Sequence, residues 1–260
     1  MSEKLKKQGM IRHAEIEIIK PDWPAAKNIH ALCTTRNLKP VAGSSVGPYA
    51  SLNLAQHVED DVTHVQLNRQ RLKKQLQLPA EPLWLEQVHG KQVVNVALPE
   101  KLTADASYSR LENKVCAVMT ADCLPVLICN RKGDRVAAAH AGWRGLVDGV
   151  VEATIQSLNE KPENLLVWLG PAIGAQAFEV GAEVRDAFIK NLAESSLAFK
   201  ENRPGHYLAD IYLLARLCLK RVGIEAVYGG EYCTYTDANY FYSYRRDGKT
   251  GRQVSLIWFS

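Results

Sequence analysis

The chain has 260 residues, of which 47% are hydrophobic and 23% are charged, and its formal net charge is +4. This length and apolar content allow a sizeable core, and the nearly balanced charge leaves no broad basic surface for unspecific nucleic-acid binding. No apolar run is long enough to span a bilayer. The early lysines are not followed by an apolar run as long as that of a secretory signal peptide. We therefore expect a cytoplasmic protein without a membrane or nucleic-acid partner, and reduced cysteines because CxxC pairs are lacking.

The first half of the chain combines a loop, a helix and several strand candidates. A segment rich in Gly, Pro and Ser within 31–54 predicts an irregular loop that lines a pocket. Asp60 and Asp61 then precede apolar residues at helical spacing, which predicts an acidic N-cap and an amphipathic helix that ends at 78–79. From Leu83 to Trp143, short apolar runs between turn residues predict the strands of one sheet, the first of them over 82–90.

The second half alternates helical patterns with short apolar runs. The patterns predict helices over 146–158, 184–192 and 208–222, and strands over 165–170, 224–230 and 253–259. No internal repeat and no linker with the composition of a hinge is present. The sequence therefore predicts one domain of mixed α/β or α+β architecture over residues 1–260.

Three segments place a metal-ligand type of side chain beside glycine or a small residue: EQVHG with His89, TADCLP with Cys123, and AAHAGWRG with His140. A thiolate with two imidazoles suits zinc, and three protein ligands leave a position for water or substrate, as catalytic zinc requires. The intervals of 34 and 17 residues match neither a zinc finger nor an HExxH helix, so the spacing alone is weak evidence. An isolated cysteine is ordinarily a small core residue, which describes Cys116 and Cys129 well.

Copper is the alternative metal, because imidazole and thiolate suit it too, although seven histidines are few for a multi-copper cluster. Arginines that present paired donors are the anion-binding candidates, namely Arg36, Arg144, Arg245 and Arg246. Arg144 is the best of them because it follows His140 by four residues and precedes a predicted helix start, where backbone amides favour anions. Each of them is otherwise an ordinary surface arginine. The aromatic residues of 232–246 either stack on a flat heterocycle or fill gaps beside strands.

Several motifs occur in one order along the chain: PYASLNLAQHVEDD, EQVHG, TADCLPVLIC, HAGWRGLVDGVVEATI, GPAIGAQAFEVG and FYSYRRDGKTGR. Together they resemble the YfiH-type laccase-domain family, also called the multicopper polyphenol oxidase-like family, from about residue 30 to the C-terminus. The resemblance implies one α/β domain with layered mixed sheets and flanking helices, and a zinc site whose ligands match His89, Cys123 and His140. The segment 37–46 departs from the Gly-Gly pair that relatives carry there, which affects loop contacts to substrate.

The resemblance also implies an activity. Members of the family are described as purine nucleoside enzymes that phosphorolyse adenosine, inosine and S-methyl-5'-thioadenosine and deaminate adenosine in the same pocket; older annotation calls them laccases. The implied partners are a small-molecule nucleoside and phosphate, with no obligatory protein partner. For deamination, a carboxylate or histidine near the metal moves the proton, and Asp122 and Glu86 are candidates.

For phosphorolysis the site must hold phosphate near the ribose C1′ and stabilise the departing purine. We expect Arg144, with Arg245 or Arg246, to bind the anion. Arg36 is a further candidate for substrate binding, and Asn53 is a candidate for a hydrogen bond to the sugar or base.

Three rival functions remain open at this stage. Cys123 as a thiolate nucleophile with His140 as its base predicts a hydrolase, for instance an amidase that edits cytoplasmic peptidoglycan precursors. The second rival is a copper-dependent polyphenol oxidase, and the third is a metal-binding protein without enzymatic activity.

Overall fold

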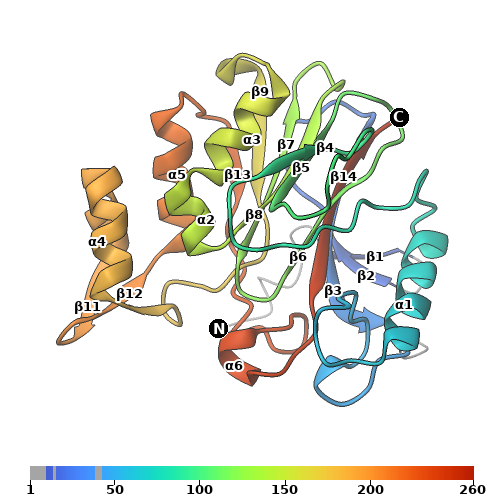
Figure 1. Cartoon of the computed structure of the whole chain (residues 1–260), viewed down its shortest axis with the longest axis horizontal. Helices are drawn as coiled ribbons and strands as arrows, with labels where there is room; N and C mark the ends of the chain where they lie inside the picture. The colour runs from blue at the N-terminus through green and yellow to red at the C-terminus, as the bar shows by residue number, and fades with distance from the viewer. Residues whose placement is uncertain (1–9, 14–15, 39–42) are drawn as a thin grey trace.

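The computed structural model describes residues 10–13, 16–38 and 43–260. Residues 39–42 of the loop predicted within 31–54, which also belong to the atypical segment 37–46, therefore lie outside the described residues. The strands form two large sheets and one small sheet, with strand orders β1-β2-β3-β14-β6, β13-β9-β7-β8-β5-β4 and β10-β12-β11. The fold is mixed α/β with layered sheets and flanking helices, as predicted (Figure 1).

The five-stranded sheet consists of β1 (Met10–His13), β2 (Ile16–Ile19), β3 (Ile29–Leu38), β14 (Gln253–Phe259) and β6 (Cys116–Thr120). The six-stranded sheet consists of β13 (Val227–Gly229), β9 (Leu165–Leu169), β7 (Leu124–Asn130), β8 (Val136–Ala141), β5 (Ala106–Ser109) and β4 (Val93–Asn95). The small sheet consists of β10 (Glu179–Gly181), β12 (His206–Ala209) and β11 (Phe199–Arg203). The helices are α1 (Val62–Gln75), α2 (Trp143–Asp148), α3 (Val150–Leu158), α4 (Ala182–Asn191), α5 (Ile211–Arg221) and α6 (Tyr244–Asp247), with short 3-10 turns at Gly47–Tyr49, Pro162–Asn164 and Ala193–Ala198.

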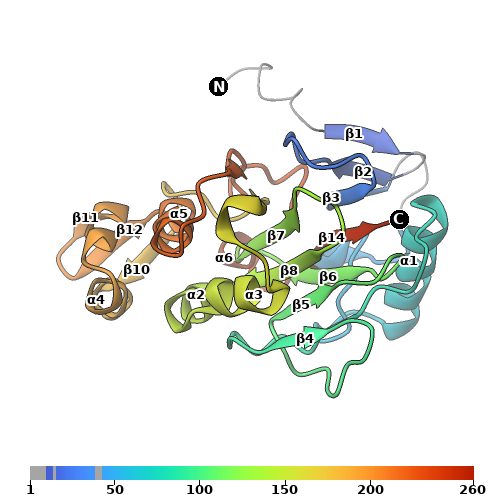
Figure 2. The same ribbon diagram turned by 90° about the horizontal axis from the view of Figure 1, so that it is seen from above.

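The two large sheets stack on each other, and helices cover their outer faces, with α1 on one side and α2, α3 and α5 on the other (Figures 1 and 2). Successive side chains of a strand point to opposite faces. In β14, Leu256 therefore packs with Leu72 of α1, whereas Ile257 packs with Leu127 between the sheets. In β7, Ile128 packs on the helical side. Strands buried on both faces explain why the sequence shows continuous apolar runs rather than alternation.

Helix α1 begins where the sequence predicts it. The side chain of Asp61 accepts hydrogen bonds from the backbone N–H groups of Thr63 and His64, which otherwise lack partners in the first turn. Val65 and Leu72 are fully buried on its inner face. No helix in the described part of the chain is long and apolar enough to cross a membrane.

Helix α1 ends at Gln75 rather than at 78–79, α4 spans Ala182–Asn191 rather than 184–192, and two other predicted helices also differ in their boundaries. The helix predicted over 146–158 is two helices, because Gly149 has a left-handed φ of 91° that ends α2 and begins α3. The helix predicted over 208–222 begins later, because Asp210 caps α5 by accepting the N–H of Leu213. Residues 208–209 belong to β12 instead.

The prediction of a single sheet between Leu83 and Trp143 was wrong. Strand β6 pairs with β14 in one large sheet, whereas β7 pairs with β8 and β9 in the other. Residues 121–123 carry the chain from one sheet to the other, and Asp122 takes a left-handed φ of 88° in this crossing. The strand predicted over 82–90 is also absent, since only isolated bridges form there and the N–H groups of 88–90 donate to a side chain, Asp105.

Candidate metal centre

The structure brings His89, Cys123 and His140 together at the crossing between the two large sheets. Their donor atoms lie within 4.8 Å of one another, and they form the one such group of His, Cys, Asp or Glu donors among the described residues. The Sγ atom of Cys123 is 3.8 Å from Nε2 of His89, and the two imidazole rings meet edge to face. His89 is exposed, Cys123 is half-buried and His140 is buried, so the cluster opens on one side.

Asp105 orients two of these three residues. Its carboxylate accepts a hydrogen bond from Nδ1 of His140 at 2.8 Å, so Nδ1 carries a proton and Nε2 is the atom that faces the cluster. The same carboxylate accepts the backbone N–H groups of Val88, His89 and Gly90. Burial raises the pKa of Asp105, but the hydrogen bonds from His140 and Gly90 outweigh this effect, and the net shift is downward.

Gly142 leaves the room that the cluster needs. A Cβ atom at this position would lie 2.9 Å from Cδ2 of His89 and 3.2 Å from Sγ of Cys123. Gly145, one turn later in α2, would place a Cβ 2.8 Å from the carbonyl oxygen of Gly90. The glycines of the AHAGWRG motif therefore allow α2 to pack directly against the loop that carries His89.

Cys123 and His140 shift each other's pKa in opposite directions. Burial by itself raises the pKa of the Cys123 thiol, but the charge of His140 and hydrogen bonds with His140 and His89 lower it to about 6. Burial by itself lowers the pKa of His140, but the Cys123 thiolate and the hydrogen bond to Asp105 raise it to about 9. A thiolate is the form of cysteine that binds metals and that acts as a nucleophile.

This arrangement fits a single metal ion. Two imidazoles and one thiolate are accepted ligands of zinc and of copper, and a carboxylate behind one imidazole is the usual support of such a ligand. Three protein ligands leave at least one position for water or substrate. The three side chains can therefore hold a metal ion with an open position.

Two cavities flank the cluster. The first, which we call the Arg252 cavity, has a volume of about 370 Å³ and is lined by His57, Gln87, His89, Met119, Thr120, Ala121, Cys123, His140, Tyr244 and Arg252. The second, the Phe178 cavity, has a volume of about 260 Å³ and is lined by His89, Ala121, Asp122, Cys123, Trp143, Arg144, Ile173, Phe178, Ile211, Tyr244 and Arg245. Both cavities include His89, Cys123 and Tyr244, so they meet at the cluster.

Two of the predicted substrate-binding arginines line the Phe178 cavity. Arg144 is exposed and stacks over the ring of Trp143 at 4.4 Å; it lies in the first turn of α2 rather than before a helix start. Arg245 lies 5.7 Å from the Phe178 ring centroid, and its Nη1 donates to the carbonyl oxygens of Ala177 and Glu179. Both side chains can reach a ligand, and their roles stay predictions.

Arg36, Arg246 and Asn53 are not among the residues that line either cavity. Arg36 stacks over Tyr242 at 4.7 Å and donates to backbone carbonyls. Arg246 pairs with Asp247 and donates to three carbonyl oxygens, which occupies its guanidinium. Asn53 is fully buried, so a direct bond to substrate would require the structure to open.

The two candidate proton carriers differ in position. Asp122 lines the Phe178 cavity, where its carboxylate accepts hydrogen bonds from the Thr234 hydroxyl and the backbone N–H of Arg245. Glu86 is exposed, accepts a hydrogen bond from the Thr103 hydroxyl, and lines neither cavity. Of the two, only Asp122 is placed to reach a ligand in these cavities.

Five residues of the site were not selected from the sequence: Asp105, Gly142, His57, Thr120 and Arg252. Arg252 belongs to the same C-terminal motif as Arg245 and Arg246, and it lines a cavity beside the cluster although the sequence did not single it out. Asp105 and Thr120 carry no local signal, because their roles depend on which strands pair.

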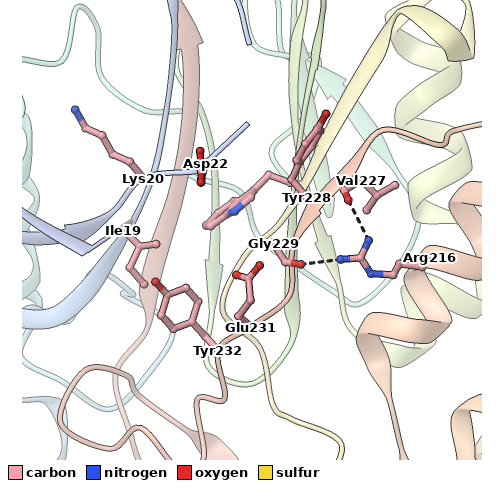
Figure 3. Close-up of a pocket in the computed structure, with 10 residues that line it drawn as sticks. Ile19, Lys20, Asp22, Arg216, Val227, Tyr228, Gly229, Glu231 and Tyr232 are labelled. Carbon is pink, nitrogen blue, oxygen red and sulfur yellow. Dashed lines mark hydrogen bonds between the residues drawn. The ribbon is translucent and has the colours of Figure 1, made fainter. Parts of the chain in front are cut away.

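A separate cavity of about 300 Å³ lies between the edges of the two large sheets and includes Lys20, Asp22 and Glu231 (Figure 3). These three charged side chains are exposed. Arg216 donates to the carbonyl oxygens of Val227 and Gly229 (Figure 3). The guanidinium thus satisfies the outer carbonyls of edge strand β13, which is a structural task.

A layered α/β fold with an open His-Cys-His cluster between two cavities defines a protein built around one candidate metal site. The chain belongs to the family described as multi-copper polyphenol oxidoreductase laccase, whose model matches residues 30–260, and the predicted family is thereby confirmed. It is 54% identical over 244 residues to a Shigella flexneri protein named purine nucleoside phosphorylase YfiH, covering 93% of this chain and 98% of that one.

Solved structures show the same fold. The Neisseria meningitidis protein NMB0706 matches with a TM-score of 0.89 and 49% identity, over 94% of this chain and 99% of that one. YlmD from Geobacillus stearothermophilus matches with a TM-score of 0.88 and 31% identity, over 97% of this chain and 99% of that one.

Proposed function

We propose that this protein is a zinc-dependent purine nucleoside enzyme. Its reactions are the phosphorolysis of adenosine, inosine and S-methyl-5'-thioadenosine, and the deamination of adenosine. The observation that supports the proposal most is the open cluster of His89, Cys123 and His140 between two cavities, in a chain 54% identical to a relative named purine nucleoside phosphorylase.

Phosphorolysis requires three things of this site. A phosphate oxygen forms a bond to C1′ of the ribose while the C1′–N9 bond breaks, its electron pair leaves with the purine, and the purine takes up a proton. The products are free base and ribose 1-phosphate. The protein must bind both reactants in one geometry, exclude water from C1′, and stabilise the charge that develops on the base.

The Phe178 cavity suits the purine. Phe178, Trp143, Ile173 and Ile211 give it an apolar wall, and flat heterocycles bury favourably against aromatic and aliphatic side chains. Asp122, on the same wall, is the carboxylate we propose for proton movement at the base. Its two oxygens are held by Thr234 and Arg245, so its position is fixed before substrate binds.

Deamination replaces the 6-amino group with oxygen. Water adds its oxygen to C6, one of its protons goes to N1 and the other to the amino nitrogen, and the bond from C6 to that nitrogen breaks so that ammonia leaves. When bound, zinc supplies a Lewis acid for this chemistry. The chain's part is to hold the purine ring with C6 toward the cluster and to carry the proton, for which we propose Asp122.

The test uses zinc-loaded protein with adenosine, with and without phosphate, and chromatography of the products. Adenine with ribose 1-phosphate should appear only with phosphate, and inosine should appear without it. Cys123→Ala should lose both activities and its bound zinc, whereas Cys233→Ala, a half-buried thiol outside the cluster, should keep them. Turnover that survives in Cys123→Ala would refute the proposal.

Removal of the metal gives a readout that does not depend on activity. A ligand that binds only the folded state stabilises it in proportion to the logarithm of its concentration over its dissociation constant. Stripping zinc with a chelator should therefore lower the melting temperature of the wild type and of Cys233→Ala, but not of Cys123→Ala. Copper in place of zinc in the purified protein, with oxidation of phenols, would favour the oxidase instead.

One observation favours a second candidate. Cys123 beside His140, with its pKa lowered to about 6, has the chemistry of an activated thiolate nucleophile. A hydrolase of amide bonds in peptidoglycan precursors would use this pair without a metal. It would remain active, or gain activity, after zinc is stripped, which is the opposite of what the nucleoside reaction predicts.

A further inference from the structure

We propose that the Arg252 cavity is the phosphate subsite, in which the Arg252 guanidinium and the Thr120 hydroxyl bind the oxyanion. The proposal rests on the proposed function for the identity of the anion as a co-substrate. It places phosphate in the cavity that Arg252 lines rather than in the Phe178 cavity, which is lined by Arg144 and Arg245, the arginines that the sequence favours.

Arg252 is a half-buried cation, and no carboxylate in the described part of the chain lies within ion-pair distance of it. Its Nη1 donates to the carbonyl oxygens of Thr250 and Gly251. Within the described ranges, no acidic side chain forms an ion pair with it, although most other arginines near the site are paired or exposed. A desolvated charge is costly unless an opposite charge accompanies it, and a guanidinium matches the oxygens of phosphate in geometry.

Thr120 supplies an unsatisfied polar atom in the same cavity. Its side chain is only 1% exposed, and its hydroxyl has no hydrogen-bond partner in the described structure. Buried hydroxyls are nearly always hydrogen-bonded, so an unpartnered one that lines a cavity indicates a missing ligand. The hydroxyl can donate a hydrogen bond to a phosphate oxygen.

Strand pairing explains why these two residues are neighbours. Thr120 is the last residue of β6 and lies opposite Gln253, the first residue of β14. Arg252 therefore stands beside the end of β6, next to the crossing that carries Cys123. The N–H of Arg252 donates to Oδ1 of Asn53 at 3.0 Å, so the buried Asn53 fixes the backbone of the proposed anion-binding residue.

The two cavities then divide the substrate between them. The exposed Arg144 faces an apolar cavity suited to the base, whereas the Arg252 cavity adds polar side chains such as His57 and Gln87. The ribose C1′ would lie where the cavities meet, at the cluster. Phosphate and purine would approach C1′ from opposite sides, as a displacement at that carbon requires.

The experiment compares four variants of the zinc-loaded enzyme. Arg252→Gln removes the charge, and Thr120→Val removes only the hydroxyl. Arg144→Gln tests the rival location of phosphate, and Arg131→Gln, at the far end of β7, is the matched surface control. Phosphate KM and adenosine KM are measured for each variant, and binding of inorganic phosphate alone is measured by calorimetry.

We expect Arg252→Gln to raise the phosphate KM and the phosphate dissociation constant by about tenfold or more, and Thr120→Val by about three- to tenfold. The adenosine KM should change by less than about twofold. Thr120→Val should keep its thermal stability, since the hydroxyl that it removes has no hydrogen-bond partner in the described structure. This variant therefore tests whether the cavity binds phosphate even if Arg252→Gln fails to fold. Arg131→Gln should match the wild type.

The proposal would be overturned if Thr120→Val and Arg252→Gln bound phosphate as tightly as the wild type. It would also be overturned if Arg144→Gln were the one variant to lose phosphate affinity. Failure of the proposed function is a different result. If the wild type binds phosphate through Arg252 but cleaves no nucleoside, the subsite stands and the nucleoside assignment falls.

Discussion

Asp105 and His140 are joined by two hydrogen bonds. The Oδ1 atom of Asp105 accepts from Nδ1 of the imidazole at 2.8 Å, and its carbonyl oxygen accepts the backbone N–H of His140 at 2.7 Å. The pair lies at the ends of β5 and β8, whose register places Ala106 opposite Ala139. One buried residue thus fixes both the position and the ring orientation of a metal-ligand candidate.

Asp105→Asn should weaken metal binding by about 10- to 100-fold, because supports of this kind orient the ligand and raise its basicity. The amide would also point one N–H group at the backbone N–H groups of 88–90, which should lower the free energy of unfolding by about 1–3 kcal/mol. Zinc affinity is measured by competition with a chelator. The matched carboxylate control is Glu86→Gln, which lies outside the cluster; equal zinc affinity in Asp105→Asn and the wild type would contradict the interpretation.

Gly142→Ala should reduce the zinc content without unfolding the protein. The added methyl group meets His89 at 2.9 Å and Cys123 at 3.2 Å, so these side chains must separate. Gly90→Ala is the control, because its Cβ would make only ordinary contacts beyond 3.5 Å although it is next to His89. Zinc is quantified per protein by elemental analysis after dialysis, and stoichiometric zinc in Gly142→Ala would show that the cluster tolerates the shift.

Tyr212→Phe should lower the free energy of unfolding by about 1–3 kcal/mol. The buried Tyr212 hydroxyl accepts the N–H of Ala172 at 2.8 Å and lies 2.8 Å from the carbonyl oxygen of Tyr232, and the variant leaves both groups without this partner. Urea denaturation measures the effect. Tyr207→Phe is the control, because Tyr207 is half-buried and its hydroxyl makes no comparable hydrogen bonds among the described residues. This variant should lower the free energy of unfolding much less.

The Glu160 carboxyl should make the free energy of unfolding depend on pH, because its pKa is lowered in the folded protein. Hydrogen bonds from the Asn164 side chain, the Lys161 backbone and the Asn130 side chain lower the pKa of its carboxyl to about 2 from an ordinary value of 4.5. Because the folded-state pKa is depressed, the stabilisation is complete above about pH 4.5 and is lost as the pH falls through about 2.

Glu160→Gln should therefore be less stable than the wild type at pH 7, and the difference should shrink at pH 3. Urea midpoints at the two pH values give the comparison. An equal difference in stability at both pH values would show that the ionised Glu160 carboxylate does not provide this stabilisation.

Local elements were predictable because their causes are local. The Asp61 cap and the apolar spacing of α1 act within a few residues, and the helix is where the sequence predicts it. The break at Gly149 and the cap at Asp210 also have local causes. Because the apolar spacing continues across both residues, the sequence pattern did not show where these helices begin and end.

The site was predictable only in part. The residue types of His89, Cys123 and His140 favoured a metal, and the family motifs pointed to the same three, although neither set the distances between them. Asn53 is a candidate for a hydrogen bond to the sugar or base, and in the structure it is fully buried and its Oδ1 accepts the backbone N–H of Arg252. No local pattern distinguishes a residue that touches a ligand from one that supports it.

The sequence by itself determined the start of α1, most of the apolar strands, the family and the types of candidate ligand. Only the tertiary structure decided that β6 and β7 lie in different sheets, that Asp105 supports His140, and that Thr120 and Arg252 line one cavity. The physical reason is the range of the interactions. Caps and periodicities act within a few residues, whereas strand partners are selected by the burial of whole faces and can lie far apart in the chain, as Thr120 and Gln253 do.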